Sequence, residues 1–213
     1  MAEPRHDAVT GGQPSPADAP ASPPADLPTM GMVVRPSAAA DDLVTIGVAL
    51  DVPDPIGRFL RTARAEFGDP LATAIPPHVT LLPPTDVQPR SHRAIEDHLA
   101  AVAAVTEPFT IRLGGTDSFR PVSPVVYIRI EDGGEGCSDL QRLVRTGPLA
   151  RPLAFPYHPH VTVAHHLDDA ALDHAQKTLA DYSAEFGVRA LGLYEHGRDG
   201  VWRLRRRFTF SGH

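Results

Sequence analysis

Short apolar runs alternate along the chain with segments in which apolar residues recur every three or four positions. Runs rich in β-branched residues predict strands, whereas the longer spacing predicts amphipathic helices. Strands are expected at 43–50, 78–82, 109–113, 125–131, 160–164, 188–194 and 202–210, and helices at 54–67, 91–105, 138–144 and 168–186. Because this order mixes crossovers with hairpins, the predicted fold class is α+β.

The tripeptide His-Val-Thr occurs twice, at 78–80 and at 160–162, and each copy follows a proline. An apolar run precedes each copy at the same interval, at 43–50 and at 125–130. Such self-similarity indicates a duplicated supersecondary unit. We therefore expect a bilobal arrangement of two pseudo-symmetric α/β lobes, with two sheets flanking a central cleft and the helices outside.

The two tripeptides carry the candidate chemistry. Residues i and i+2 of a strand share a face, so His78 lies on the same face as Thr80. His160 and Thr162 repeat this arrangement. Histidine titrates near neutrality, so a facing pair can supply one acid and one base. A neutral hydroxyl beside an imidazole suits a phosphate oxygen.

Composition limits the possible partners of the chain, which has 213 residues and a net charge of −6. Residues 1–40 are rich in proline and lack aromatic residues, which predicts a disordered tail before one folded domain at 41–213. No strong basic field marks a binder of long duplex nucleic acid. The single cysteine, Cys137, excludes an intrachain disulfide and a cysteine-based zinc site. Without a signal peptide or a membrane span, we expect a cytoplasmic protein.

The segments around the tripeptides, 77–81 and 159–164, resemble the two-histidine (2H) phosphoesterases, and in particular their bacterial 2′-5′ RNA ligase (LigT-like) branch. The resemblance spans the whole predicted domain. It departs at His165, where that branch often has an arginine. Weaker matches are the Phe119-Arg120-Pro121 loop and the basic terminal strand.

The resemblance implies a phosphodiesterase that uses no metal or other cofactor. Its substrates would be 2′,3′-cyclic or 2′-5′-linked phosphodiesters, on an RNA end or a small nucleotide. His160 would act as base and His78 as acid in hydrolysis, with the roles exchanged in the ligating direction. Thr80 and Thr162 would donate hydrogen bonds to the phosphate oxygens.

Further residues are candidates for substrate binding. Aromatic side chains stack on bases of any sequence, and Phe119, Tyr127 and Tyr157 are expected beside the site. Arg206 shares the apolar face of the predicted terminal strand and could supply a cation for phosphate. No membrane or protein partner is indicated.

Two alternatives remain open at the level of sequence. A non-catalytic RNA- or nucleotide-binding module could have the same cleft. A zinc-dependent hydrolase could use His158, His160, His165 and His166, although no cysteine or carboxylate completes the set.

Overall fold

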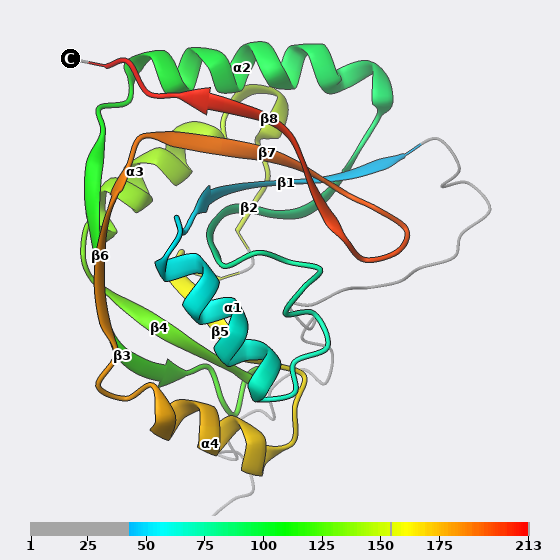
Figure 1. Cartoon of the computed structure of the whole chain (residues 1–213). Coiled ribbons are helices and arrows are strands. Elements are labelled where there is room, and N and C mark those ends of the chain that lie inside the picture. The colour runs from blue at the N-terminus through cyan, green and yellow to red at the C-terminus, as the bar shows by residue number, and fades with distance from the viewer. Residues whose placement is uncertain (1–42, 154, 213) are drawn as a thin grey trace, which may run out of the picture.

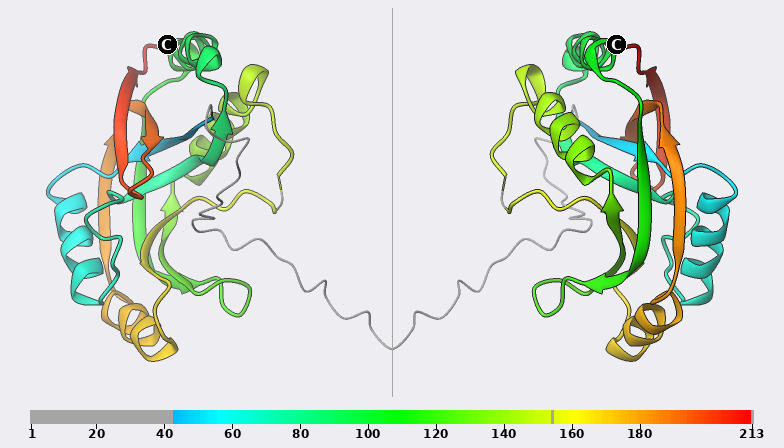
Figure 2. Two further views of the ribbon diagram at one scale, coloured as in Figure 1. Left: turned by 90° about the vertical axis from the view of Figure 1, so that its right-hand side faces the viewer. Right: turned by 90° about the vertical axis from the view of Figure 1, so that its left-hand side faces the viewer.

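The computed structural model describes residues 43–153 and 155–212, which form a curled antiparallel sheet with four α-helices (Figures 1 and 2). The fold class α+β is confirmed. The expected tail at 1–40 lies outside the described residues. No helix within the described ranges is long and apolar enough to span a membrane.

The elements follow one another closely in sequence. The strands are β1 Val44–Asp51, β2 His78–Val87, β3 Phe109–Ser118, β4 Val125–Asp132, β5 His160–His165, β6 Ser183–Val188, β7 Ala190–His196 and β8 Trp202–Thr209. The helices are α1 Ile56–Glu66, α2 His92–Val105, α3 Gly134–Val144 and α4 Asp169–Thr178.

The strands of the described residues form one sheet in the order β6-β3-β4-β5-β2-β1-β7-β8. The expectation of two sheets is therefore not met. The histidine strands β2 and β5 pair with each other through Val79 and Val161, which joins two four-stranded halves. An edge strand leaves backbone hydrogen-bonding groups without partners, and joining the halves here removes two such edges.

The segment 168–186, predicted as one long helix, is divided between α4 and β6. The helix ends at Thr178, and β6 pairs with β3 from Phe109–Val188 to Gly114–Ser183. The apolar spacing of the segment fits a helix locally. The free hydrogen-bonding edge of β3 instead selects a strand, so the tertiary context overrides the local pattern.

The helices lie against the face of the sheet that carries Val79 and Val161. These two valines are fully buried, in one core cluster with the apolar residues of the helices. Leu60 of α1 and Leu172 of α4 are examples, both fully buried. The opposite face of the central strands is thereby left to their polar side chains.

A buried ion pair holds the loop between α1 and β2, with the Arg64 side chain 4% exposed and that of Asp69 0% exposed. Arg64 donates through Nε and one terminal nitrogen to a single Asp69 oxygen, at 3.1 and 2.8 Å. Its other terminal nitrogen donates to the Ile75 carbonyl at 3.0 Å. The Leu71 amide donates to the second carboxylate oxygen at 2.9 Å. The end of α1 is thus tied to the residues that lead into His78.

Replacing Arg64 with methionine should lower the free energy of unfolding by about 3–5 kcal/mol, because Asp69 would remain as a buried charge without its partner. Arg58→Met is the matched control. It removes an exposed ion pair between Arg58, on the same helix as Arg64, and Asp54, and should leave the unfolding free energy nearly unchanged. Urea denaturation compares the two variants. Equal losses would show that the buried pair does not hold this loop.

Candidate active site

The two histidine motifs lie side by side at the centre of the sheet. The pairing of Val79 with Val161 sets the register of β2 against β5. Because the strands are antiparallel, each histidine lies across from the threonine of the other motif. The valines point into the core, so the polar side chains share the opposite face. This face, called the motif face below, carries His78, Thr80, His160 and Thr162.

Both histidines are anchored in the same way. Nδ1 of His78 lies 2.7 Å from the carbonyl oxygen of Pro76, and Nδ1 of His160 lies 2.7 Å from that of His158. A carbonyl oxygen only accepts, so each Nδ1 carries the proton and each Nε2 carries a lone pair. Nε2 of His78 lies 3.1 Å from the Thr80 hydroxyl, which donates to it. Each imidazole is thus oriented by the backbone two residues before it.

Loss of solvent lowers the pKa of both imidazoles. For His78, burial is the main cause, and the hydrogen bond to the Pro76 carbonyl opposes it. For His160, burial lowers the pKa to about 4, against a similar bond to His158. Charge on His158 and on His78 adds to the lowering of the His160 pKa. Both rings are therefore mainly neutral at pH 7 in the free protein.

Aromatic side chains surround His160. The ring centroid of Phe119 lies 4.9 Å from that of His160, and the centroid of Tyr127 lies 5.1 Å from it. The two aromatic rings also contact each other, with centroids 4.4 Å apart. Tyr127 belongs to β4 and Phe119 to the β3–β4 loop. The expectation placed both residues beside the site, and the structure brings both to His160.

Trp202 is the aromatic residue that packs on His78. Its indole stacks on the imidazole, with centroids 5.0 Å apart and planes 28° apart. It is 9% exposed and packs with Ala49 and Ile75. A Cβ on Gly47 would lie 2.8 Å from the indole, so the indole lies this close to β1 only because residue 47 has no side chain. The sequence shows Trp202 as an apolar strand residue but does not reveal this stacking.

An acidic residue lies across from His78. Asp51 of β1 pairs with it in register, and its negative charge raises the His78 pKa as a minor cause. Asp51 accepts hydrogen bonds from Arg207, at 2.5 Å, and from the Tyr194 hydroxyl. The predicted first strand ended at residue 50, one position short of this residue. Sequence reasoning therefore missed the cluster of Asp51, Tyr194 and Arg207.

A basic residue occupies the corresponding position beside His160. Arg129 of β4 pairs with His160 in register, is exposed, and donates through Nε to the Gly114 carbonyl at 3.1 Å. Among the described residues, no carboxylate lies within ion-pair distance of it. The isolated sequence offers no signal for this residue, because only the pairing of β4 with β5 brings it to the motif.

Tyr157 does not reach the motif face. Its hydroxyl donates to the carbonyl oxygen of Thr80 at 2.9 Å, and its ring packs against the core. Burial raises its pKa. Its contacts attach the segment before β5 to the backbone of β2, which is a structural role.

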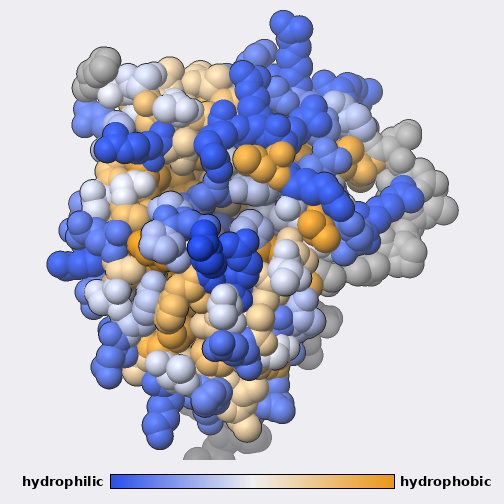
Figure 3. Space-filling view, viewed as in Figure 1, coloured by the Kyte–Doolittle hydropathy of each residue, from blue (hydrophilic) through white to orange (hydrophobic). Residues whose placement is uncertain are grey.

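Arg206 also lies on the other side of the sheet. It pairs in register with the buried Leu193 and donates to Glu96 of α2 at 2.8 Å. The cause is a register shift in β8. Leu193 pairs with Arg206 but Tyr194 pairs with Leu204, which leaves Arg205 as an extra residue. In the space-filling view, hydrophilic side chains gather over the region where β8 runs beside α2 (Figure 3).

The histidines proposed as zinc ligands do not form a cluster. In the described part of the chain, no three His, Cys, Asp or Glu side chains lie where they could hold one metal ion. His158 and His160 have ring centroids 6.1 Å apart. His165 instead stacks on His166, with centroids 3.6 Å apart, and burial lowers its pKa to about 4.

Known proteins resemble this chain in fold and in sequence. Crystal structures of Escherichia coli LigT match with a TM-score of 0.57 in the apo form, at 21% identity, covering 80% of this chain and 99% of LigT. LigT complexed with 3′-AMP gives 0.57 at 17% identity, over 79% and 99%. The protein TT0787 of Thermus thermophilus gives 0.53 at 21% identity, over 79% and 99%.

Sequence comparison assigns the family. A protein of Bacillus thuringiensis, provisionally named a phosphoesterase, is 28% identical over 147 residues, covering 67% of this chain and 84% of the relative. A Bacillus cereus protein with the same provisional name matches equally. The profile of the 2′-5′ RNA ligase superfamily matches residues 52–200, which include both histidine motifs. This chain therefore belongs to the 2′-5′ RNA ligase superfamily, the family of the 2H phosphoesterases.

Proposed function

We propose that the protein is a metal-independent phosphodiesterase that acts on 2′,3′-cyclic phosphates or 2′-5′ linkages of RNA ends or small nucleotides. One observation carries the proposal. Two imidazoles with the same Nδ1 anchor, at 2.7 Å in both cases, present their Nε2 atoms on one face of two adjacent strands. Each has a threonine hydroxyl beside it. The family supports phosphodiesterase or RNA-ligase-type activity.

The geometry fits in-line hydrolysis of a cyclic phosphate. Nε2 of His160 takes a proton from water, and the water oxygen forms a bond to phosphorus as the bond to the ribose oxygen breaks. Protonated His78 donates its Nε2 proton to that leaving oxygen. The hydroxyls of Thr80 and Thr162 donate to the other phosphate oxygens, where negative charge develops. In the ligating direction the two histidines exchange roles.

The charges beside the histidines favour this assignment of roles. Asp51 favours the protonated form of His78, which suits an acid. Burial holds the pKa of His160 at about 4, so this imidazole is neutral near pH 7, which suits a base. A bound phosphodiester would bring a negative charge to the motif face and so oppose the lowering of the His78 pKa that burial causes. The acid would thus be protonated mainly when substrate is present.

A nucleotide substrate fits the remaining side chains. Phe119 would stack on a nucleobase beside His160, with the buried Tyr127 ring packed against it. The terminal nitrogens of Arg129 could bind a phosphate oxygen of the substrate. The LigT structure with 3′-AMP shows that this fold accepts a nucleotide in that protein.

Replacing either His78 or His160 with alanine should lower turnover of a 2′,3′-cyclic nucleotide by about 10²–10⁴-fold, the usual effect of losing a positioned acid or base. The double variant should be little worse than either single variant, because both groups act in one step. Steady-state kinetics and circular dichroism test this. A folded single variant with wild-type turnover would rule out the two-histidine mechanism. Nucleotide binding by a wild-type protein that lacks turnover would favour a binding module.

The pH dependence of kcat/KM should be bell-shaped, with a maximum on the acid side of neutrality. The base limb rises near pH 4, where His160 loses its proton. At higher pH, kcat/KM falls because His78 loses its proton. The pKa of free His78 lies below its ordinary 6.5, and above this pKa the protonated fraction drops about tenfold per pH unit. The fall in kcat should occur at a higher pH than the fall in kcat/KM, since a bound phosphate raises the His78 pKa. A kcat/KM maximum above pH 8 would contradict these roles.

Activity should persist in excess EDTA, because the two threonines and a protonated histidine can stabilise the charge on phosphate. Turnover is measured before and after dialysis against chelator, and again after zinc is added. Loss on chelation with recovery on zinc would favour the metal alternative at His158, His160 and His165.

A further inference from the structure

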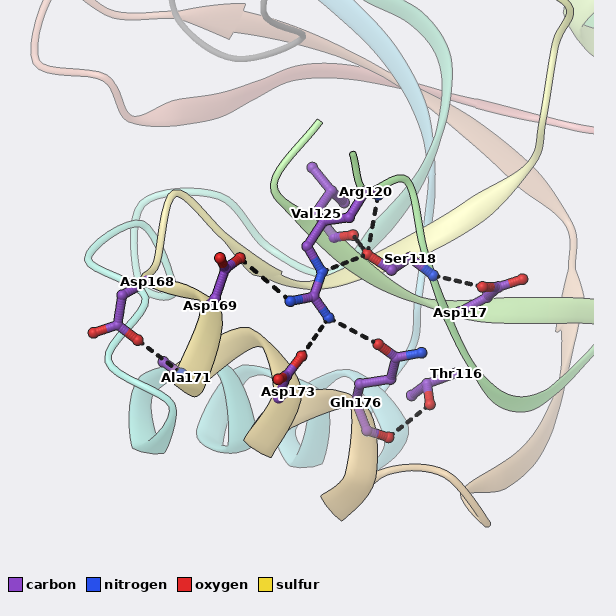
Figure 4. Close-up of polar contacts among 10 residues, drawn as sticks. All are labelled: Thr116, Asp117, Ser118, Arg120, Val125, Asp168, Asp169, Ala171, Asp173 and Gln176. Atoms are coloured by element: carbon purple, nitrogen blue, oxygen red, sulfur yellow. Dashed lines mark hydrogen bonds and ion pairs between the residues drawn. The ribbon is translucent and has the colours of Figure 1, made fainter. Parts of the chain in front are cut away.

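Arg120 joins the β3–β4 loop to helix α4 (Figure 4). One terminal nitrogen donates to Asp173 at 2.6 Å and to the Gln176 side-chain oxygen at 3.1 Å. The other lies 3.4 Å from Asp169, and Nε donates to the Ser118 hydroxyl at 3.2 Å. The guanidinium thus uses all three nitrogens, and the carboxylates raise the pKa of Arg120.

Helix α4 is built to receive this side chain. Asp169, Asp173 and Gln176 are spaced four and three residues apart, so they lie on one helix face. The helix is fixed at its start by Asp168, whose side chain accepts from the Ala171 amide at 2.8 Å (Figure 4). The acceptors for Arg120 therefore come from a capped helix and not from a loop.

The residue before Arg120 is Phe119, which contacts His160 and Tyr127. Within the turn that follows β3, the Phe119 side chain contacts the motif and the Arg120 side chain contacts α4. The loop itself is short and locally bonded. The Phe119 carbonyl accepts from the Val122 and Ser123 amides at 2.9 and 3.1 Å. Holding Arg120 therefore holds the Phe119 ring.

We infer that Arg120 is a positioning residue that fixes Phe119 as a nucleobase platform, and that α4 thereby sets the affinity of the site for base-bearing phosphodiesters. The inference rests on the proposed function.

A purely structural role for the Arg120 cluster fits the contacts less well. The side chain of Arg120 is 24% exposed, whereas those of Asp169 and Asp173 are 88% and 69% exposed. Exposed carboxylates regain water when the contact is lost, so they add little to fold stability. The exposed Val122 shows that the tip of the loop is not held by the core. The consequence of losing Arg120 should therefore be concentrated on Phe119.

The test compares 2′,3′-cyclic AMP with glycerol 1,2-cyclic phosphate, which has the same five-membered phosphodiester but no base. Arg120→Ala should raise KM for the nucleotide about tenfold, within the range of base–aromatic stacking, with kcat nearly unchanged. Kinetics on the glycerol compound should stay within about twofold. Asp173→Ala should shift the nucleotide KM in the same direction, and the double variant should be no worse than Arg120→Ala. Arg120→Lys keeps the positive charge but loses the planar guanidinium, so its KM for the nucleotide should lie between those of the wild type and Arg120→Ala.

The control is Arg58→Ala, which removes an exposed arginine of α1 from its ion pair with Asp54. It should leave kcat and KM for both substrates unchanged. Hydrogen exchange at the amides of residues 119, 120, 122, 123 and 125 should become faster in both Arg120→Ala and Asp173→Ala. Equal losses on both substrates would overturn the inference, as would a normal KM in Asp173→Ala or unchanged exchange.

If wild-type protein turns over neither compound, the proposed function is wrong. The positioning role is then decided by exchange together with the calorimetric Kd for 3′-AMP. Weaker binding and faster exchange in Arg120→Ala would support that role, and unchanged values would overturn it.

Discussion

The pairing of β2 with β5 is the constraint on which the rest of the site depends. It is a single register pair, Val79 with Val161, at the centre of an eight-stranded sheet. The side-chain period of a strand is two, so a slip of one residue would turn one histidine into the core and one valine to solvent. Burying both valines therefore fixes the register, and with it the position of each histidine across from the threonine of the other motif. Apolar packing on one face of the sheet sets the chemistry on the other.

The same pairing explains why the backbone of the site is symmetric although the charges beside the two histidines differ. Each histidine is anchored by a carbonyl two residues earlier, because the two motifs repeat the same local backbone. The strands next to them, β1 and β4, place Asp51 across from His78 and Arg129 across from His160. A symmetric backbone thus carries an asymmetric charge pattern.

Sequence reasoning reached those features that depend on local pattern. The two motifs, the α+β class and the last two strands each follow from alternation or repetition within short windows. The strand β6 did not, because residues 183–188 become a strand only through pairing with β3. Arg206 failed for a similar reason, since the extra residue Arg205 reverses the face of the strand after Leu204. A register shift is a property of two strands together, and one strand's alternation cannot show it.

The side chains around the histidines come from segments distant in sequence, and each is held by a different kind of contact. Trp202 lies flat beside His78 because Gly47 on β1 leaves room for the indole. Phe119 lies at His160, and the neighbouring Arg120 is bound to α4. These aromatic rings remove water from the imidazoles, and the same loss of water lowers the pKa of both. The side chains that pack on the imidazoles therefore also keep both rings mainly uncharged in the free protein.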